Sequence, residues 1–266
     1  MSNLIKRIIA GIFGIPLLLY ISYEGGYLLL GLTLILNTIA MWEFCSMFEK
    51  KEIYTLKILT VAAADTLLVF SVNSSGISEQ LILNILFCGI LFITFEIFRK
   101  EKRSPINPAI SAFGLLYITV PFILMNFLQS QSVKLIIVFI FILIWTCDSM
   151  AYFGGRMFGK RKLSDISPNK TWEGSVTGFI FTVIISVLLH FIFPNEITIY
   201  KAVSIGILIG IFSQTGDLFE SMIKRYCGVK DSSNLIPGHG GILDRFDSLI
   251  FVVPVIFILL SVLKGF

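Results

Sequence analysis

Residues 221–247 combine carboxylates, cations and glycines at a density that is unusual for so apolar a chain. Glycines let backbone N–H groups approach phosphate oxygens, and lysine and arginine neutralise the negative charge of the phosphate. Aspartates are hard oxygen ligands for magnesium. The residues of these types are Ser221, Lys224, Arg225, Lys230, Asp231, His239, Gly240, Gly241, Asp244, Arg245 and Asp247. The segment therefore contains the groups that a nucleoside triphosphate site needs.

A carboxylate precedes this segment at Asp217, near the end of an apolar run. Ser213 is followed by Asp217, Glu220, Ser221 and Lys224 at spacings of four, seven, eight and eleven residues from Ser213. These spacings place all five residues on one stripe of a helix. Within a membrane, such a stripe must face the protein interior or a wet cavity. A hydrogen-bonded structural seam is the alternative interpretation.

A second polar segment, residues 154–173, follows Asp148 at the end of another apolar run. Its candidate phosphate-binding residues are Arg156, Ser167, Asn169 and Lys170. Pro168 and Gly174 bracket a predicted helix start, and a helix N-terminus favours anions. Neither segment has a Walker-A pattern or a Ser/His/Asp nucleophile arrangement, so we expect no covalent intermediate.

The elements that must position these residues are predicted to be membrane helices. Of the 266 residues 56% are hydrophobic and 14% are charged, and the mean hydropathy is +0.88, far from the composition of a soluble protein. Apolar runs without period-2 alternation favour helices over barrel strands. Nine such runs occur, at 8–23, 27–47, 56–73, 80–98, 110–128, 133–153, 174–193, 200–220 and 248–264. The predicted fold is an all-α polytopic membrane bundle.

Charge placement predicts the orientation of this bundle. With nine spans, eighteen of the twenty-one lysines and arginines fall on the side of the N-terminus. The positive-inside rule therefore makes the N-terminus cytoplasmic. Both polar segments lie on that side as long loops, so we interpret 1–130 as a transmembrane scaffold (helices 1–5) and 133–266 as the catalytic transmembrane half (helices 6–9).

Three further carboxylates lie in the first half. Glu43 and Glu96 are near cytoplasmic helix ends, where snorkelling or pairing with Arg99 explains them. Asp65 is in the middle of a run and is either an interhelical hydrogen-bond partner or part of an ion path.

Four motifs together resemble the signature of the bacterial phosphatidate cytidylyltransferases, or CDP-diacylglycerol synthases. They are Ser221…Lys224-Arg225, Lys230-Asp231, Pro237-Gly-His-Gly-Gly241 and Asp244-Arg-Phe-Asp247. Ser167-Pro-Asn-Lys-Thr-Trp-Glu-Gly174 is similar to the second loop of that family, in which the position of Asn169 is often basic. The resemblance is specific over about 133–250.

The resemblance implies a magnesium-dependent transfer of CMP from CTP to phosphatidic acid in a homodimer of the bacterial inner membrane, with the active site at the cytoplasmic face and no nucleic acid partner. It implies that Asp217 and Asp244 hold metal. We expect Asp231 and Asp247 to be further ligands or to support the ligands, and a second, monovalent ion stays open. Lys224, Arg225, Lys230 and Arg245 would neutralise triphosphate, while Lys170 and Arg156 would hold the lipid phosphate.

Three alternatives remain at this point. A CDP-archaeol-type synthase or a CTP-dependent lipid kinase would use similar groups. An ion-coupled transporter would explain intramembrane Asp65, Asp148 and Asp217, but it predicts charges near the midplane and paired halves, whereas these charges gather at one rim.

Overall fold

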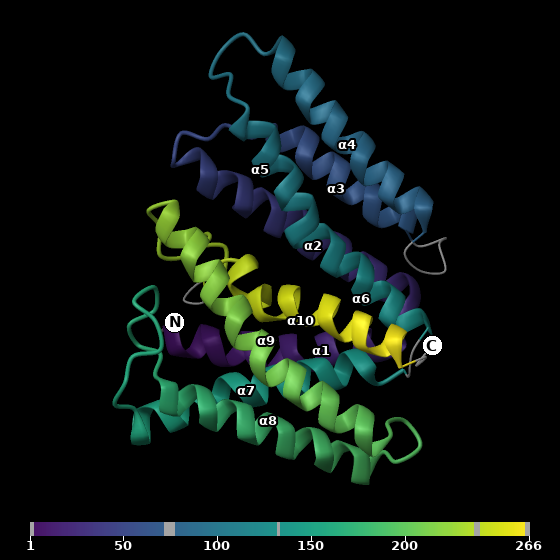
Figure 1. Cartoon of the computed structure of the whole chain (residues 1–266), viewed down its shortest axis with the longest axis vertical. Coiled ribbons are helices and arrows are strands. Elements are labelled where there is room, and N and C mark those ends of the chain that lie inside the picture. The colour runs from purple at the N-terminus through teal and green to yellow at the C-terminus, as the bar shows by residue number, and fades with distance from the viewer. Residues whose placement is uncertain (1–2, 72–77, 132–133, 237–239, 264–266) are drawn as a thin grey trace. The chain divides into compact units, whose positions relative to one another are not determined.

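The computed structural model describes residues 3–71, 78–131, 134–236 and 240–263 (Figure 1). Within these ranges all the long elements are helical, and extended pairing is limited to two isolated bridges. The helices are α1 (Asn3–Glu24), α2 (Gly26–Glu49), α3 (Lys57–Ser71), α4 (Glu79–Phe98), α5 (Ile106–Gly114), α6 (Val120–Gln131), α7 (Ile136–Phe158), α8 (Trp172–Ile192), α9 (Ile199–Tyr226) and α10 (Leu243–Val262). A π-helical stretch, η1 (Leu115–Thr119), joins α5 to α6.

The predicted all-α membrane bundle is confirmed. Within the described residues each predicted apolar run coincides with helix, and the run at 110–128 is the continuous α5, η1 and α6. Seven helical stretches in the described part of the chain are long and apolar enough to cross a membrane. They are α2, α4, α5 to α6, α7, α8, α9 and α10. The count of nine spans and the cytoplasmic N-terminus stay predictions.

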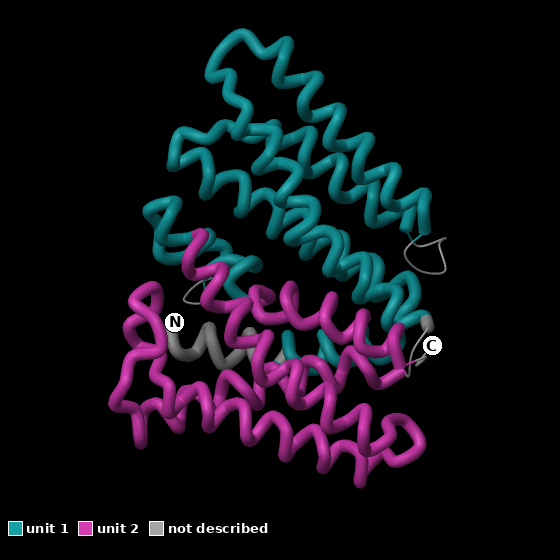
Figure 2. Tube along the Cα trace, in the orientation of Figure 1, with its two compact units in different colours: residues 1–130, 224–245 teal, residues 131–223, 246–266 magenta. Residues whose placement is uncertain are grey.

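The chain forms two compact units (Figure 2). Unit 1 comprises residues 1–130 and 224–245, and unit 2 comprises residues 131–223 and 246–266. Residues 224–245, which contain most of the charged segment, therefore fold with the N-terminal helices. The border between the units passes through α9 and α10, so that each of these helices contributes residues to both units.

Unit 1 contains a polar network within its helices. The Asn37 amide of α2 donates to Asp65 Oδ1 of α3 over 2.8 Å, and the Thr38 hydroxyl lies 2.8 Å from the other oxygen of Asp65. Thr119, the last residue of η1, donates to the Asn37 side-chain oxygen over 3.0 Å. Asp65 is thus an interhelical hydrogen-bond partner, which was one of its two predicted roles.

Unit 2 is built on close packing of α7 against α8. A Cβ added to Gly174 would lie 3.0 Å from Gly155 Cα, and one added to Gly178 would lie 2.7 Å from the Cys147 carbonyl oxygen. Small residues let membrane helices approach at backbone distance. This packing fixes the start of α8, and the loop that precedes it, against the end of α7.

Candidate active site

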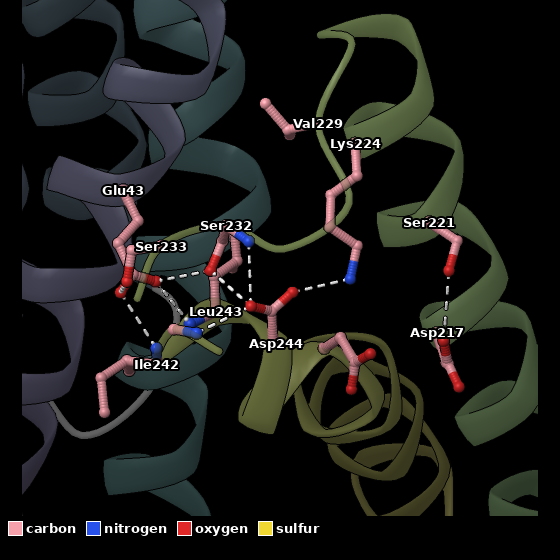
Figure 3. A network of polar contacts seen from close by, with 12 residues as sticks. Glu43, Asp217, Ser221, Lys224, Val229, Ser232, Ser233, Ile242, Leu243 and Asp244 are labelled. Carbon is pink, nitrogen blue, oxygen red and sulfur yellow. Dashed lines mark hydrogen bonds and ion pairs between the residues drawn. The ribbon is translucent and has the colours of Figure 1, made fainter. Parts of the chain in front are cut away.

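Asp244 lies in the first turn of α10, and its side chain is 6% exposed (Figure 3). Its Oδ1 accepts a hydrogen bond from Lys224 Nζ over 2.7 Å, and its Oδ2 accepts from the backbone N–H groups of Gly241 (2.7 Å) and Ser232 (2.9 Å). A carboxylate is also favoured at a helix N-terminus by the helix dipole. The burial of this charge is therefore offset by an ammonium group and by backbone donors.

Lys224 reaches Asp244 from the last turn of α9, and its side chain is 11% exposed. The chain reverses directly after this helix: Gly228 has φ +72°, and the Val229 N–H donates to the Lys224 carbonyl oxygen over 2.9 Å. This turn starts the loop that returns to α10. The end of α9 and the start of α10 thus present an ammonium and a carboxylate to each other across one loop.

Glu43 of α2 holds the same loop from the N-terminal part of unit 1. Its Oε1 accepts hydrogen bonds from the Ser233 hydroxyl (2.6 Å) and the Ile242 N–H (3.0 Å). Its Oε2 accepts from the Ser232 hydroxyl and the Leu243 N–H, both over 2.9 Å. Only 4% of Glu43 is exposed. The prediction that Glu43 snorkels or pairs with Arg99 is wrong, whereas Glu96 does pair with Arg99 over 3.2 Å.

These contacts define a group of residues that we call the Asp244 cluster. It consists of Glu43, Lys224, Ser232, Ser233, Gly241, Ile242, Leu243 and Asp244. The Ser232 hydroxyl lies 2.9 Å from both Glu43 and Asp244, and its single proton can serve one of them at a time. All members belong to unit 1.

The two glycines of the motif have clear structural roles. Gly240 adopts φ +79°, a conformation that favours glycine, and its carbonyl oxygen accepts from the Ile236 N–H over 2.9 Å. A Cβ on Gly241 would overlap the Ser232 hydroxyl and the Glu43 carboxylate. The glycine pair therefore lets the loop pass close to Asp244, and the Gly241 N–H is donated to that carboxylate.

Unit 2 contains a second group, the Asp217 cluster, formed by Lys170, Asp217 and Ser221. Lys170 Nζ forms an ion pair with Asp217 Oδ2. The Ser221 hydroxyl, one turn further along α9, lies 3.4 Å from Asp217 Oδ1 (Figure 3). The side chains of Lys170 and Asp217 are 28% and 32% exposed, so this cluster is the more open of the two. Both residues were predicted from the sequence.

The loop before α8 fixes the position of Lys170. Its backbone N–H donates to the Ser167 carbonyl oxygen over 3.0 Å, and its own carbonyl oxygen accepts from the Leu163 N–H over 2.8 Å. Thr171 caps α8 by accepting from the Gly174 N–H, which confirms the predicted helix start. Glu173 accepts from the N–H groups of residues 160 and 161 and so ties the loop to the first turn of α8.

The other predicted site residues lie mostly on the surface of their units. The exposed ones are Asp148, Arg156, Asn169, Arg225, Lys230, Asp231 and Arg245. Arg225 donates to the Val229 carbonyl oxygen, and Asp247 Oδ1 accepts from the Ser248 N–H over 2.6 Å. His239 lies outside the described residues.

The donors of the two clusters suit magnesium. Carboxylate oxygens are its preferred protein ligands, and it is typically held by one or two carboxylates together with waters and substrate phosphates. Asp217 and Asp244 each lie against a lysine ammonium, which shows that a cation is accommodated beside both. Among the residues that the structure describes, no three His, Cys, Asp or Glu side chains gather into an all-protein metal cage.

Fold and clusters together define an integral membrane protein that presents paired lysines and aspartates from the ends of apolar helices. The chain belongs to the cytidylyltransferase family, whose family model matches residues 5–263. It is 33% identical to a phosphatidate cytidylyltransferase of Staphylococcus saprophyticus, over 96% of this chain and 97% of that protein. It is 32% identical to proteins of the same name from Staphylococcus haemolyticus and Staphylococcus aureus, again over 96% of this chain and over 98% and 97% of those proteins.

Proposed function

We propose that this protein is a phosphatidate cytidylyltransferase, which transfers CMP from CTP to phosphatidic acid and yields CDP-diacylglycerol and pyrophosphate. The observation that carries this proposal is the match to proteins of that name over nearly the whole length of both chains. The motifs of residues 221–247 and 167–174 support it, because they supply Lys224 and Asp244 of one cluster and Lys170, the partner of Asp217, of the other.

In the proposed reaction a phosphate oxygen of the lipid attacks the α-phosphorus of CTP in line. The new bond joins that oxygen to the α-phosphorus, and the bond from the α-phosphorus to the bridging oxygen breaks, so that pyrophosphate leaves with the electron pair. The lipid phosphate is already ionised at neutral pH, so no strong general base is required. The protein must instead supply positive charge, because two polyanions repel each other.

The lysines of the clusters are the main candidates for this charge. Lys224, with Arg225, Lys230 and Arg245 nearby in the sequence, would bind the triphosphate and the leaving group. Lys170, with Arg156, would hold the lipid phosphate. In the free protein Lys170 and Lys224 each balance an aspartate. An arriving phosphate would compete for the ammonium groups, and the aspartates would then need another cation.

Asp217 and Asp244 are the residues that would provide carboxylate ligands to magnesium, with Asp231 and Asp247 as further ligands. When bound, the ion would neutralise charge on the nucleotide phosphates. The chain's own contribution is to hold these carboxylates in place, Asp244 through the backbone donors around it and Asp217 through Lys170 and Ser221.

The location and assembly of the enzyme follow from the same proposal. We place it in the bacterial inner membrane with both clusters toward the cytoplasm, because CTP is cytoplasmic and the cationic loops are predicted on that side. The homodimer implied by the family resemblance belongs to the proposal as well.

The experiment that tests the function is pyrophosphate release by the detergent-purified protein. Phosphatidic acid is supplied with CTP, UTP or ATP in turn, and magnesium is then chelated. We expect release with CTP alone, dependent on the lipid and on the metal. Release of CDP in place of pyrophosphate would indicate a lipid kinase. No release by protein that is shown to be folded would refute the proposal.

A further inference from the structure

Two hollows lie next to each other on the helices of unit 1, and the residues that line them are not members of either cluster. The first has a volume of about 630 Å³ and opens where α2 ends, α3 begins and α4 ends. The second is a groove of about 480 Å³ between α3 and α4. Leu59 and Ala62 of α3 line both hollows, so the groove continues from the first hollow, which we call the mouth.

The mouth is lined by cationic and aromatic side chains. Lys57 Nζ lies 3.2 Å from Glu49 and 4.2 Å from the centre of the Trp42 ring. Arg99 uses one terminal nitrogen, Nη1, for the Tyr54 carbonyl oxygen and for Glu96. Its Nε and Nη2 have no hydrogen-bond partner among the described residues, and its side chain is 26% exposed. A guanidinium with free donors beside an ammonium is a typical phosphate-binding arrangement.

The charge around the mouth favours an anion. Residues 49–57 and 96–103, which flank it, contain seven lysines and arginines against four glutamates. The Glu96 carboxylate is 5% exposed and also accepts hydrogen bonds from the Ser104 N–H and the Asn107 amide, so its charge is largely satisfied away from the mouth. Among the lining residues themselves, Lys57 and Arg99 stand against Glu49, which is paired with Lys57, so Arg99 carries the net positive charge of the lining.

The groove that leads from the mouth is mostly apolar. Its walls include Leu59, Ala63, Leu67 and Phe70 of α3, and Leu81, Phe87, Cys88 and Leu91 of α4. From Leu59 to Ser71 the helix rises about 18 Å. This length is close to one leaflet of a bilayer, whose hydrocarbon core is about 30 Å thick. The groove can therefore accept one extended acyl chain.

We propose that the mouth and the groove together bind an anionic phospholipid, with its phosphate at Lys57 and Arg99 and one acyl chain between α3 and α4. A cationic head site that is continuous with an apolar channel one leaflet long matches an amphiphile rather than a soluble anion or a purely apolar helix. None of the lining residues belongs to the Asp244 or Asp217 cluster. The site is thus a second lipid site, separate from the proposed chemistry.

Trp42 provides a direct probe, because it lines the mouth and is one of only three tryptophans. Replacing Trp145 and Trp172 with phenylalanine leaves Trp42 as the single emitter. The protein is placed in zwitterionic bilayers that contain a small fraction of brominated anionic phospholipid, or of brominated zwitterionic lipid as reference. The Trp42 emission in each brominated bilayer is divided by the emission in a bilayer that contains the same lipid without bromine. We expect stronger quenching by the anionic lipid.

Two pairs of variants test the site. Lys57→Gln should weaken the apparent affinity for the anionic lipid on the order of fivefold, about 1 kcal/mol per cation, whereas Lys100→Gln, an exposed lysine outside the mouth, should not. Ala62→Phe fills the groove and should reduce quenching, whereas Val69→Phe, on the same helix but outside the lining, should not.

The outcomes separate the possible occupants. Equal quenching by both lipids, or anionic quenching that Lys57→Gln and Ala62→Phe leave unchanged, would overturn the proposal. Displacement of the brominated lipid by soluble glycerol phosphate would also overturn it, since the site would then bind free phosphate. Quenching that disappears only when the protein associates with itself would identify a second copy of the chain as the occupant. Because the readout is fluorescence, the result does not depend on the proposed enzymatic activity.

Discussion

Glu43→Gln is the substitution that most directly tests how Asp244 is held. Glu43 lies outside the motifs, yet each of its oxygens accepts from one serine hydroxyl and one backbone N–H of the loop at 232–243. Glutamine has nearly the same shape but only one acceptor oxygen. In either orientation its amide group faces a backbone N–H, of Ile242 or of Leu243, and two donors then oppose each other.

The size of the effect follows from these contacts. The variant loses one hydrogen bond to a charged acceptor and leaves one buried backbone donor unsatisfied, which we expect to cost about 2–4 kcal/mol. The loop at 232–243 would then open roughly 30- to 1,000-fold more often. Asp244 would lose its fixed position, because its backbone donors, Ser232 and Gly241, belong to the same loop.

Amide hydrogen exchange read by mass spectrometry measures this opening, and pyrophosphate release measures its consequence. We expect faster exchange of peptides that cover 232–243 and a lower rate. Glu101→Gln is the matched control, because Glu101 is exposed in the loop after α4. Unchanged exchange in Glu43→Gln would refute the reasoning, whatever the activity.

Three further predictions concern the two clusters and a buried thiol. Asp217→Asn and Asp244→Asn should each lower the rate of pyrophosphate release by more than about 100-fold, with the protein still inserted in membranes. Asp65→Asn, in the hydrogen-bonded network of unit 1, should lower that rate less than about tenfold. A normal rate in either of the first two variants would contradict the metal assignment. Gly241→Ala should lower thermal stability in detergent by about 1–3 kcal/mol, because the added methyl group overlaps the hydroxyl and carboxylate that it faces, and an unchanged unfolding temperature would contradict that packing. Burial raises the pKa of Cys227 from 9.0 to about 11, so at pH 8 its thiolate fraction should be about 100-fold lower than that of an ordinary cysteine. Peptide mapping after iodoacetamide treatment should show slow alkylation that speeds up as the pH approaches 11. Rapid alkylation of the folded protein at pH 8 would contradict this raised pKa.

The helices could be predicted from the sequence because hydrocarbon permits few backbone structures. Long apolar runs must satisfy their N–H and C=O groups internally, and each predicted run is helical. The ends were less well predicted. The run at 200–220 continues as helix to Tyr226, and the run at 133–153 continues to Phe158, because polar residues at a membrane surface still support helix. Lys224 therefore lies on α9, as the predicted stripe with Ser213 and Asp217 requires.

The site was predictable where its residues are close in sequence or share a motif. Lys170, Lys224 and Asp244 come from the two polar segments, and Asp217 lies on the helical stripe that leads into one of them. The structure pairs each lysine with an aspartate. Glu43 was missed because its partners lie about 190 residues away. The available signal was a carboxylate inside an apolar helix, which by itself does not reveal whether its partner is a cation, a hydroxyl or a backbone N–H.

The way in which the Asp244 cluster balances its charges bears on what it can bind. The partners of Glu43 among the described residues are two serine hydroxyls and two backbone N–H groups, one of the hydroxyls being shared with Asp244. Lys224 is the cationic member of the cluster, and it is paired with Asp244. Among the residues that define the cluster, two carboxylates stand against one ammonium, and a buried excess of one sign of charge is costly. A magnesium ion that arrives with a nucleotide would offset this excess, whereas a triphosphate alone would add to it. We therefore propose that the cluster receives the nucleotide together with the metal, because the proposed reaction brings in a triphosphate whose charge must be offset.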